Sequence, residues 1–145
     1  MSTIDSAQQT AIRVMLAADS AQAVNGKLYI LGGGFDRITL PPGVPLQFRF
    51  DLAMIIEVPW TATNHPIHVT VDLLDADGQP IGYHAEGQLE TGRPPGARHG
   101  ASFPVPLVFP VPAEFPAPGR YTISGSIDGE ESARVSLEVA GSSPV

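Results

Sequence analysis

The sequence predicts an all-β protein, and three observations lead to that prediction. Apolar residues alternate with other residues along several stretches, which is the period of a half-buried strand. Many of the 15 glycines and 15 prolines stand between those stretches, where turns require them. No helical periodicity lasts longer than a turn. We therefore expect an antiparallel β-sandwich of about eight strands, immunoglobulin-like in its arrangement.

The length of 145 residues is typical of one domain. We place this single β-sandwich domain at residues 11–140. The polar N-terminal residues 1–10 and the small and polar residues 141–145 are expected to be flexible ends.

Composition limits the possible functions. Because cysteine is absent, the chain offers no disulfide, thiol nucleophile or thiolate metal site, which suits a reducing compartment. The net charge of -7 and the single lysine disfavour nucleic acid and anionic membranes as partners. The N-terminal residues lack the basic start and apolar core of a secretory signal, and no apolar run is long enough to span a membrane. We expect a cytoplasmic protein with no cofactor.

The first two strands lie around a tight turn. Alternating apolar residues predict a first strand that contains Ile12, Val14, Leu16 and Ala18. The connection to the next strand is expected from Asp19 to Gln22. Asn25-Gly26 supplies the positive φ angles of a turn. The run from Leu28 to Leu31 has no polar alternation, so we predict a strand buried on both faces, ended by Gly32-Gly33-Gly34. The rest of the sandwich is expected to be arranged around this strand.

The third strand has the strongest periodic signal. Every even position from 46 to 58 is apolar, which predicts one long strand with a buried even face: Leu46, Phe48, Phe50, Leu52, Met54, Ile56 and Val58. Pro59 closes it.

Two later hairpins are predicted from the odd numbering of their apolar residues. Apolar residues on both arms of each hairpin stand at odd positions, so each loop should hold an odd number of residues if both arms face one core. We predict three-residue loops at Ala76-Asp77-Gly78 and Ile127-Asp128-Gly129. In the first hairpin this pairs Val71 with Tyr83.

Between the hairpins, residues 103–118 carry proline at six of the eight even positions and apolar residues at the odd ones. Alternate residues of a strand direct their N–H groups to the same side, so these prolines remove donors from one side only. We predict an edge strand that is closed to strand addition, packed through Phe103, Val105, Leu107 and Phe109. Recognition of the prolines by a partner is the alternative.

Several motifs in the sequence point to a known family: Ala18-Asp19-Ser20-Ala21-Gln22, Asn25 to Phe35 (Asn-Gly-Lys-Leu-Tyr-Ile-Leu-Gly-Gly-Gly-Phe) and Glu57-Val58-Pro59-Trp60. With these motifs the chain resembles, from about Ile12 to Val139, a family of short uncharacterised bacterial proteins common in actinobacteria. The resemblance implies no activity.

Two places carry candidate binding residues. Trp60, Asn64 and His68 follow the end of the long strand, where an aromatic ring near amide and imidazole groups can stack on a sugar or anchor a protein. Arg93 lies in the loop from Gly92 to Gly100, a basic spot on an acidic chain.

The second place is the family signature, with its polar residues Asp19, Gln22 and Lys27. A structural role predicts that their polar groups are spent on backbone hydrogen bonds, whereas exposure favours recognition.

Catalytic and metal-binding patterns are weak. Pro66 between His65 and His68 forbids the helix that would bring both to one zinc ion, and Ser102 lies in an incomplete nucleophile elbow. We therefore expect no metal and a non-enzymatic binding or structural protein, an adaptor acting through contacts with another protein or through self-association. The alternatives are a carbohydrate-binding module centred on Trp60 and an enzyme without a recognisable site.

Overall fold

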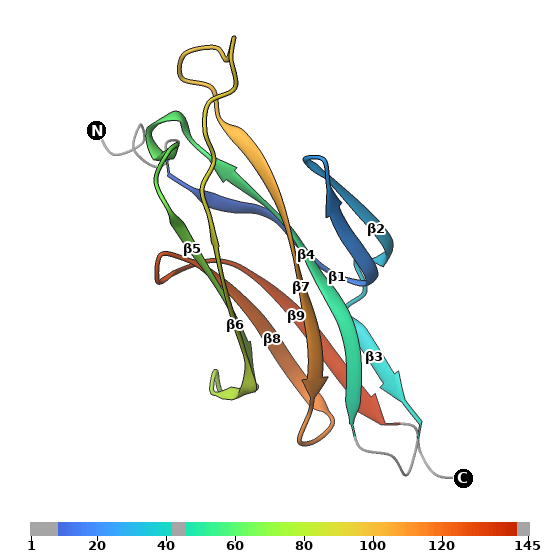
Figure 1. Ribbon diagram of the computed structural model, residues 1–145. Helices are drawn as coiled ribbons and strands as arrows, with labels where there is room; N and C mark the ends of the chain where they lie inside the picture. The colour runs from blue at the N-terminus through green and yellow to red at the C-terminus, as the bar shows by residue number, and fades with distance from the viewer. Residues whose placement is uncertain (1–8, 42–45, 142–145) are drawn as a thin grey trace.

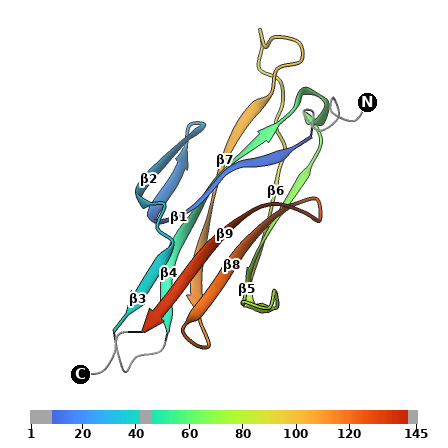
Figure 2. The same ribbon diagram turned by 180° about the vertical axis from the view of Figure 1, so that it is seen from behind.

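Residues 9–41 and 46–141 are described by the computed structural model of the chain. Two β-sheets pack face to face around one core (Figures 1 and 2). The elements in chain order are β1 (Ala11–Val24), β2 (Lys27–Gly33), β3 (Arg37–Leu40), β4 (Gln47–Val58), the single-turn 3-10 helix η1 (Trp60–Ala62), β5 (Ile67–Leu74), β6 (Pro80–Leu89), β7 (Phe103–Glu114), β8 (Gly119–Ile127) and β9 (Glu130–Gly141).

The predicted all-β fold is confirmed. One sheet has the strand order β2-β1-β4-β7 and the other β3-β9-β8-β5-β6, which makes nine strands within the described ranges. The strand beyond the expected eight is β3, which pairs parallel with β9, so the sandwich is not wholly antiparallel. Of the predicted flexible ends, residues 1–8 and 142–145 lie outside the described part of the chain.

Strand β4 supplies the centre of the core, as its period of two predicts. Its even residues from Phe50 to Val58 are fully buried, and Phe48 packs partly buried beside them. Phe50 contacts two other aromatic rings, Phe35 and Phe48, at centroid distances of 6.0 Å. Side chains of β5, β8 and β9 face it from the other sheet, and the apolar residues of both sheets therefore form one core.

Strand β1 departs from the predicted alternation. A bulge between Ile12 and Val14 shifts its register against β4. As a result Ile12 and Ala17 enter the core, whereas Leu16 and Ala18 face the outer side of the sheet. The predicted connection from Asp19 to Gln22 is instead the continuation of β1.

Both later hairpins keep the predicted parity but contain bulges. Asp75 and Gln79 close a loop at Ala76–Gly78, but a shift farther along the strands pairs Val71 with Ala85 instead of Tyr83. In the β8–β9 hairpin the loop has two residues, Asp128 and Gly129, because a bulge beside Ser126 takes up the odd residue.

Strand β7 lies at an edge of its sheet, as predicted. Its odd residues Phe109, Val111 and Ala113 are buried. The Tyr83 hydroxyl on β6 donates a hydrogen bond of 2.9 Å to the Pro110 carbonyl, which ties this side of the sandwich together. Burial raises the pKa of the Tyr83 hydroxyl, so it remains a donor at neutral pH.

Across the described ranges, no helix has the length and apolar character needed to cross a membrane.

Candidate functional site

The β1–β2 hairpin stands apart from the body of the sandwich (Figures 1 and 2). Asn25 and Gly26 have φ angles of 51° and 74°, as the predicted tight turn requires. Up to Ala18, strand β1 pairs with β4, and from Ala18 onward it pairs with β2. The half of β1 that carries the hairpin has therefore separated from β4, and among the described strands β2 pairs with β1 alone.

Two contacts hold the base of the hairpin to the sheet. The buried carboxylate of Asp51 on β4 accepts a hydrogen bond of 2.9 Å from the Ala21 N–H. Beneath the hairpin a small apolar cluster covers the outer face of the sheet, formed by Ala18, Ala21 and Ala53 with Leu16, Leu28 and Val108. The hairpin is thus anchored at its base and along one of its faces.

The other face of the hairpin is exposed and carries the apolar side chains of Val24, Tyr29 and Leu31, whose exposed fractions are 42%, 54% and 72%. Ile30, the cross-strand neighbour of Ala21, lies on the anchored face and is 37% exposed. The prediction that the run from Leu28 to Leu31 is buried on both faces is therefore wrong. A run of apolar residues without alternation contains no information about which face is covered, and here nothing in the described chain covers β2 on this side.

Main-chain groups are also exposed along β2. Because the turn has two residues, Val24 and Lys27 form the hydrogen-bonded closing pair of the hairpin, and such pairs alternate with non-bonded ones. Leu28 and Ile30 consequently direct their N–H and C=O groups away from β1. We call this side of β2 the open edge.

The other edge strands β7, β3 and β6 are each less suited to strand addition. Strand β7 pairs with β4 in an unbroken antiparallel register, so its even residues direct their main-chain groups away from β4. The prolines at 104, 106, 110 and 112 therefore remove N–H donors from the outer edge. Strand β3 is only four residues long. Strand β6 carries the charged cluster around His84 and a glycine with φ of 118°, Gly82. Among these four terminal strands, β2 is the one that has none of these features along Leu28 to Leu31.

Asp19, Gln22 and Lys27 all lie on this hairpin and are exposed. None of their side chains makes a hydrogen bond or an ion pair with another described residue of the chain. The carboxylate of Asp19 lies over Gly32, where a Cβ atom would collide with it. Their role in binding stays a prediction, and their exposure is the arrangement that recognition requires.

Sequence reasoning named these polar residues but missed the exposed apolar ones, Tyr29, Ile30 and Leu31. A usable signal was present, because the same sequence blocks one sheet edge with prolines and leaves Leu28 to Leu31 without proline or charge.

The predicted binding place around Trp60 is formed by two loops. The guanidinium of Arg93 lies over the indole ring at 4.0 Å from its centroid. Arg93 also donates hydrogen bonds to Thr63 Oγ1 at 2.7 Å and to the Trp60 carbonyl at 2.9 Å. The His99 ring contacts the indole as well, at 4.8 Å between centroids. Arg93 therefore occupies a face of the ring that a sugar would need for stacking.

Asn64 and His68 take part mainly through their backbones. Asn64, with φ of 63°, donates its N–H to the Thr91 carbonyl at 2.8 Å. The His68 N–H is bonded to the Asp128 carboxylate at 3.0 Å, in the turn between β8 and β9, and its side chain is exposed. The loops are thus joined by Trp60, Arg93 and Asn64, while His68 is engaged with a different turn.

Arg93→Ala is expected to lower the free energy of unfolding by about 1–2 kcal/mol, because it removes a cation–π contact and two partly solvated hydrogen bonds. Urea denaturation followed by the fluorescence of the single tryptophan measures it. Arg98→Ala, in the same exposed loop, is the control and should change stability little. Equal stability of the two variants would contradict the structural role of Arg93.

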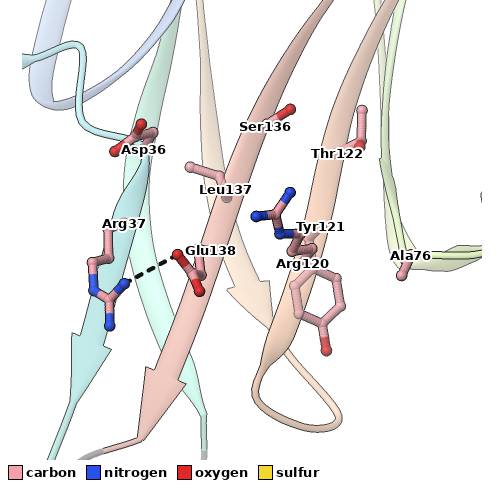
Figure 3. Close-up of a pocket in the computed structure, with 9 residues that line it drawn as sticks. All are labelled: Asp36, Arg37, Ala76, Arg120, Tyr121, Thr122, Ser136, Leu137 and Glu138. Atoms are coloured by element: carbon pink, nitrogen blue, oxygen red, sulfur yellow. Dashed lines mark hydrogen bonds and ion pairs between the residues drawn. The ribbon is translucent and has the colours of Figure 1, made fainter.

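The outer face of the five-stranded sheet is polar. A hollow of about 510 Å³ lies over β3, β9 and β8 (Figure 3). Arg37 and Glu138 form an ion pair at 3.0 Å across it, and Arg120 is the cross-strand neighbour of Glu138 on the other side. Exposed pairs of this kind contribute little energy, but they favour solvent over a protein partner on this face.

His84, on the same face, lies between two carboxylates. Its Nδ1 is 2.6 Å from Asp72 Oδ1 and its Nε2 is 2.9 Å from Glu86 Oε2. The hydrogen bond with Glu86 and then the one with Asp72 raise the pKa of His84 above its usual 6.5. No group of three or more possible metal ligands occurs among the described residues.

The raised pKa predicts how stability depends on pH. Protonated His84 stabilises the folded state, so its contribution is fully present below pH 6.5 and is lost as the pH rises through the higher pKa of the folded protein. Urea denaturation at a series of pH values should show this loss in the wild type and not in His84→Gln. An NMR titration in which His84 titrates at or below 6.5 would contradict the prediction.

Comparison with known proteins gives one family. A family model described as a family of unknown function (DUF6941) matches residues 13–140. None of the curated proteins matches the chain. Among solved structures the chain is similar to the Pseudomonas fluorescens alkylpurine DNA glycosylase AlkC bound to DNA containing an abasic site analog, at 13% identity and a TM-score of 0.42, over 90% of this chain and 30% of that chain. The chain thus spans less than a third of the glycosylase, and a likeness this distant says nothing about its activity.

Proposed function

Because the chain belongs to DUF6941, a family of unknown function, we propose a function from its own structure: it is a non-enzymatic binding protein that adds a strand of another protein chain to the open edge of β2. Edge pairing supplies main-chain hydrogen bonds, and the exposed side chains beside the edge supply specificity.

The contrast between the two edges of one sheet supports the proposal. At β7, prolines remove the outward donors. At β2, Leu28 and Ile30 keep theirs, and Leu31 is 72% exposed. Proteins usually protect an apolar edge because it pairs with other chains, so an edge left open beside a protected one is expected to serve binding.

The rest of the molecule fits binding better than catalysis. Ser102 donates to Glu57 at 2.7 Å, and His99 packs on Trp60, so both are engaged in contacts within the chain. The net charge of -7 disfavours nucleic acid as the partner. The proposal places the protein in a bacterial cytoplasm, where a cysteine-free chain needs no oxidising environment.

A proline at position 30 tests the proposal, because it copies onto β2 the substitution pattern that blocks β7. Ile30→Pro removes one outward N–H and leaves the bonds between β1 and β2 in place. The matched control is Glu114→Pro, which adds a proline at an outward-facing position of the edge that is already blocked and lies outside the cluster beneath the hairpin.

Wild type and both variants serve as baits in extracts of the cells that naturally make the protein, and the captured proteins are quantified by mass spectrometry. We expect a protein that binds the wild type and Glu114→Pro but not Ile30→Pro. In the purified complex, amide exchange at Leu28 and Ile30 should be slowed. Capture of the same proteins by all three baits, or unchanged exchange at β2, would contradict strand addition.

A further inference from the structure

The strand that pairs with the open edge can be specified further. We infer that it is β2 of a second copy of this chain, so that the four-stranded sheets of two copies join through an antiparallel β2–β2 pair. This inference rests on the proposed function, because it names the partner of the same edge.

The backbone of β2 is suited to a two-fold arrangement. Leu28 and Ile30 direct their main-chain groups outward, and Tyr29 lies between them. When Leu28 of each copy pairs with Ile30 of the other, all outward groups of both residues find partners. The two-fold axis then passes between the two Tyr29 residues, which form the central non-hydrogen-bonded pair.

The side chains are self-complementary in the same register. Tyr29 meets Tyr29 of the second copy, and Leu31 comes opposite Lys27, whose aliphatic stem packs on it. These are among the most exposed apolar residues of the described chain, at 54% for Tyr29 and 72% for Leu31. Pairing two copies therefore removes from water the apolar surface that the fold itself leaves uncovered.

Charge supports a second copy over an unrelated strand. Lys27, the single lysine of the sequence, stands at the turn end of β2, and the Asp19 carboxylate lies over Gly32 at the opposite end. Antiparallel pairing brings the cationic end of each hairpin to the anionic end of the other. Neither Lys27 nor Asp19 has an ion-pair partner among the described residues. Because the contact is two-fold symmetric, the attraction between Lys27 of one copy and Asp19 of the other occurs twice.

The assembly also closes. After two β2 strands pair, the outer edges of the joined sheet are the two β7 strands, and both are blocked by proline. Further copies cannot add, so the product is a dimer and not a fibre. In this dimer the open edge of β2 forms the contact, and the blocked edge of β7 prevents the addition of further copies.

Size-exclusion chromatography with light scattering, from about 1 to about 500 μM protein, measures the association. We expect a concentration-dependent dimer in the wild type and in Glu114→Pro. Ile30→Pro should raise the dimer dissociation constant about tenfold or more, because central main-chain bonds are lost. A wild type that stays monomeric throughout, or a dimer that Ile30→Pro leaves unchanged, would overturn the inference.

Cysteine cross-linking tests the register, because the chain has no cysteine of its own. Tyr29→Cys places two thiols across the central non-hydrogen-bonded pair, whose Cα atoms are about 4.5 Å apart, a separation that a disulfide can span. The control is Gln22→Cys, on the same exposed face but one strand away from the edge, so its two thiols are separated by about 14 Å. Oxidation should link Tyr29→Cys several-fold faster, and equal rates would contradict the register.

The outcomes separate this inference from the proposed function. A monomeric protein whose captured partner is lost in Ile30→Pro would overturn the second copy as the occupant and leave strand addition standing. If Ile30→Pro changes neither the dimer nor the captured proteins, both the second copy as occupant and strand addition at β2 would be overturned.

Discussion

Phe50→Ala is expected to lower the free energy of unfolding by about 3–5 kcal/mol, enough to unfold much of a marginally stable domain. Phe50 is completely buried on β4 and contacts the rings of Phe35 and Phe48. Alanine would leave a cavity at the centre of the core, where neighbouring strands cannot collapse without breaking their ladders. Denaturant unfolding followed by far-UV circular dichroism measures the loss.

Leu31→Ala is the matched control, because it truncates an apolar side chain that is 72% exposed. We expect a change in monomer stability within about 0.5 kcal/mol. A large loss of stability in dilute Leu31→Ala would show that the hairpin is covered within the monomer, and the open edge would then be excluded as a docking surface.

Asp51→Ala is expected to have the second-largest effect, about 1–3 kcal/mol, and to act on the hairpin. The Asp51 carboxylate is 9% exposed and accepts the buried Ala21 N–H at 2.9 Å. Alanine would leave that N–H without a partner in the described structure, which costs its desolvation energy. Relative to the wild type, amide exchange should become faster in β2 and stay unchanged in β8, because β8 lies in the other sheet.

Asp51→Asn is the informative companion variant. Its amide oxygen can accept the same hydrogen bond without the charge, so most of the stability and the slow exchange of β2 should return. If Asn and Ala at this position destabilise equally, the carboxylate charge and not the hydrogen bond would be what holds the hairpin.

The sandwich and the hairpin therefore have different physical bases. The sandwich depends on burial of large side chains from both sheets, as at Phe50, whereas the hairpin is held by one buried hydrogen bond and a cluster of small residues such as Ala53. An element held by so few contacts can adjust its exposed edge to a partner without disturbing the core.

The sequence by itself determined the elements whose side chains alternate. The even face of β4 is buried as its period of two requires, because a strand presents successive residues to opposite faces. The prolines of β7 determined its place at an edge, since proline has no N–H to donate. The parity of both later hairpins also held: Ile123 pairs with Val135, both at odd positions.

The candidate site was predictable only in part. The family signature between Ala18 and Phe35 was identified, and the structure places its polar residues Asp19, Gln22 and Lys27 exposed on one hairpin. The contact between the Trp60 and Arg93 loops joins residues 33 positions apart in the chain. It was not predictable, because local sequence patterns do not show which distant segments pack together.

Tertiary structure alone decided three features. Bulges in β1, β6 and β9 moved registers that parity left open. A bulge costs little locally, and its position is determined by how the whole strand packs. The parallel pairing of β3 depends on where β9 runs. The exposure of Leu31 depends on β1 leaving β4 after Ala18, because an apolar run specifies attraction to some surface, and only the path of the chain decides whether that surface belongs to the same molecule.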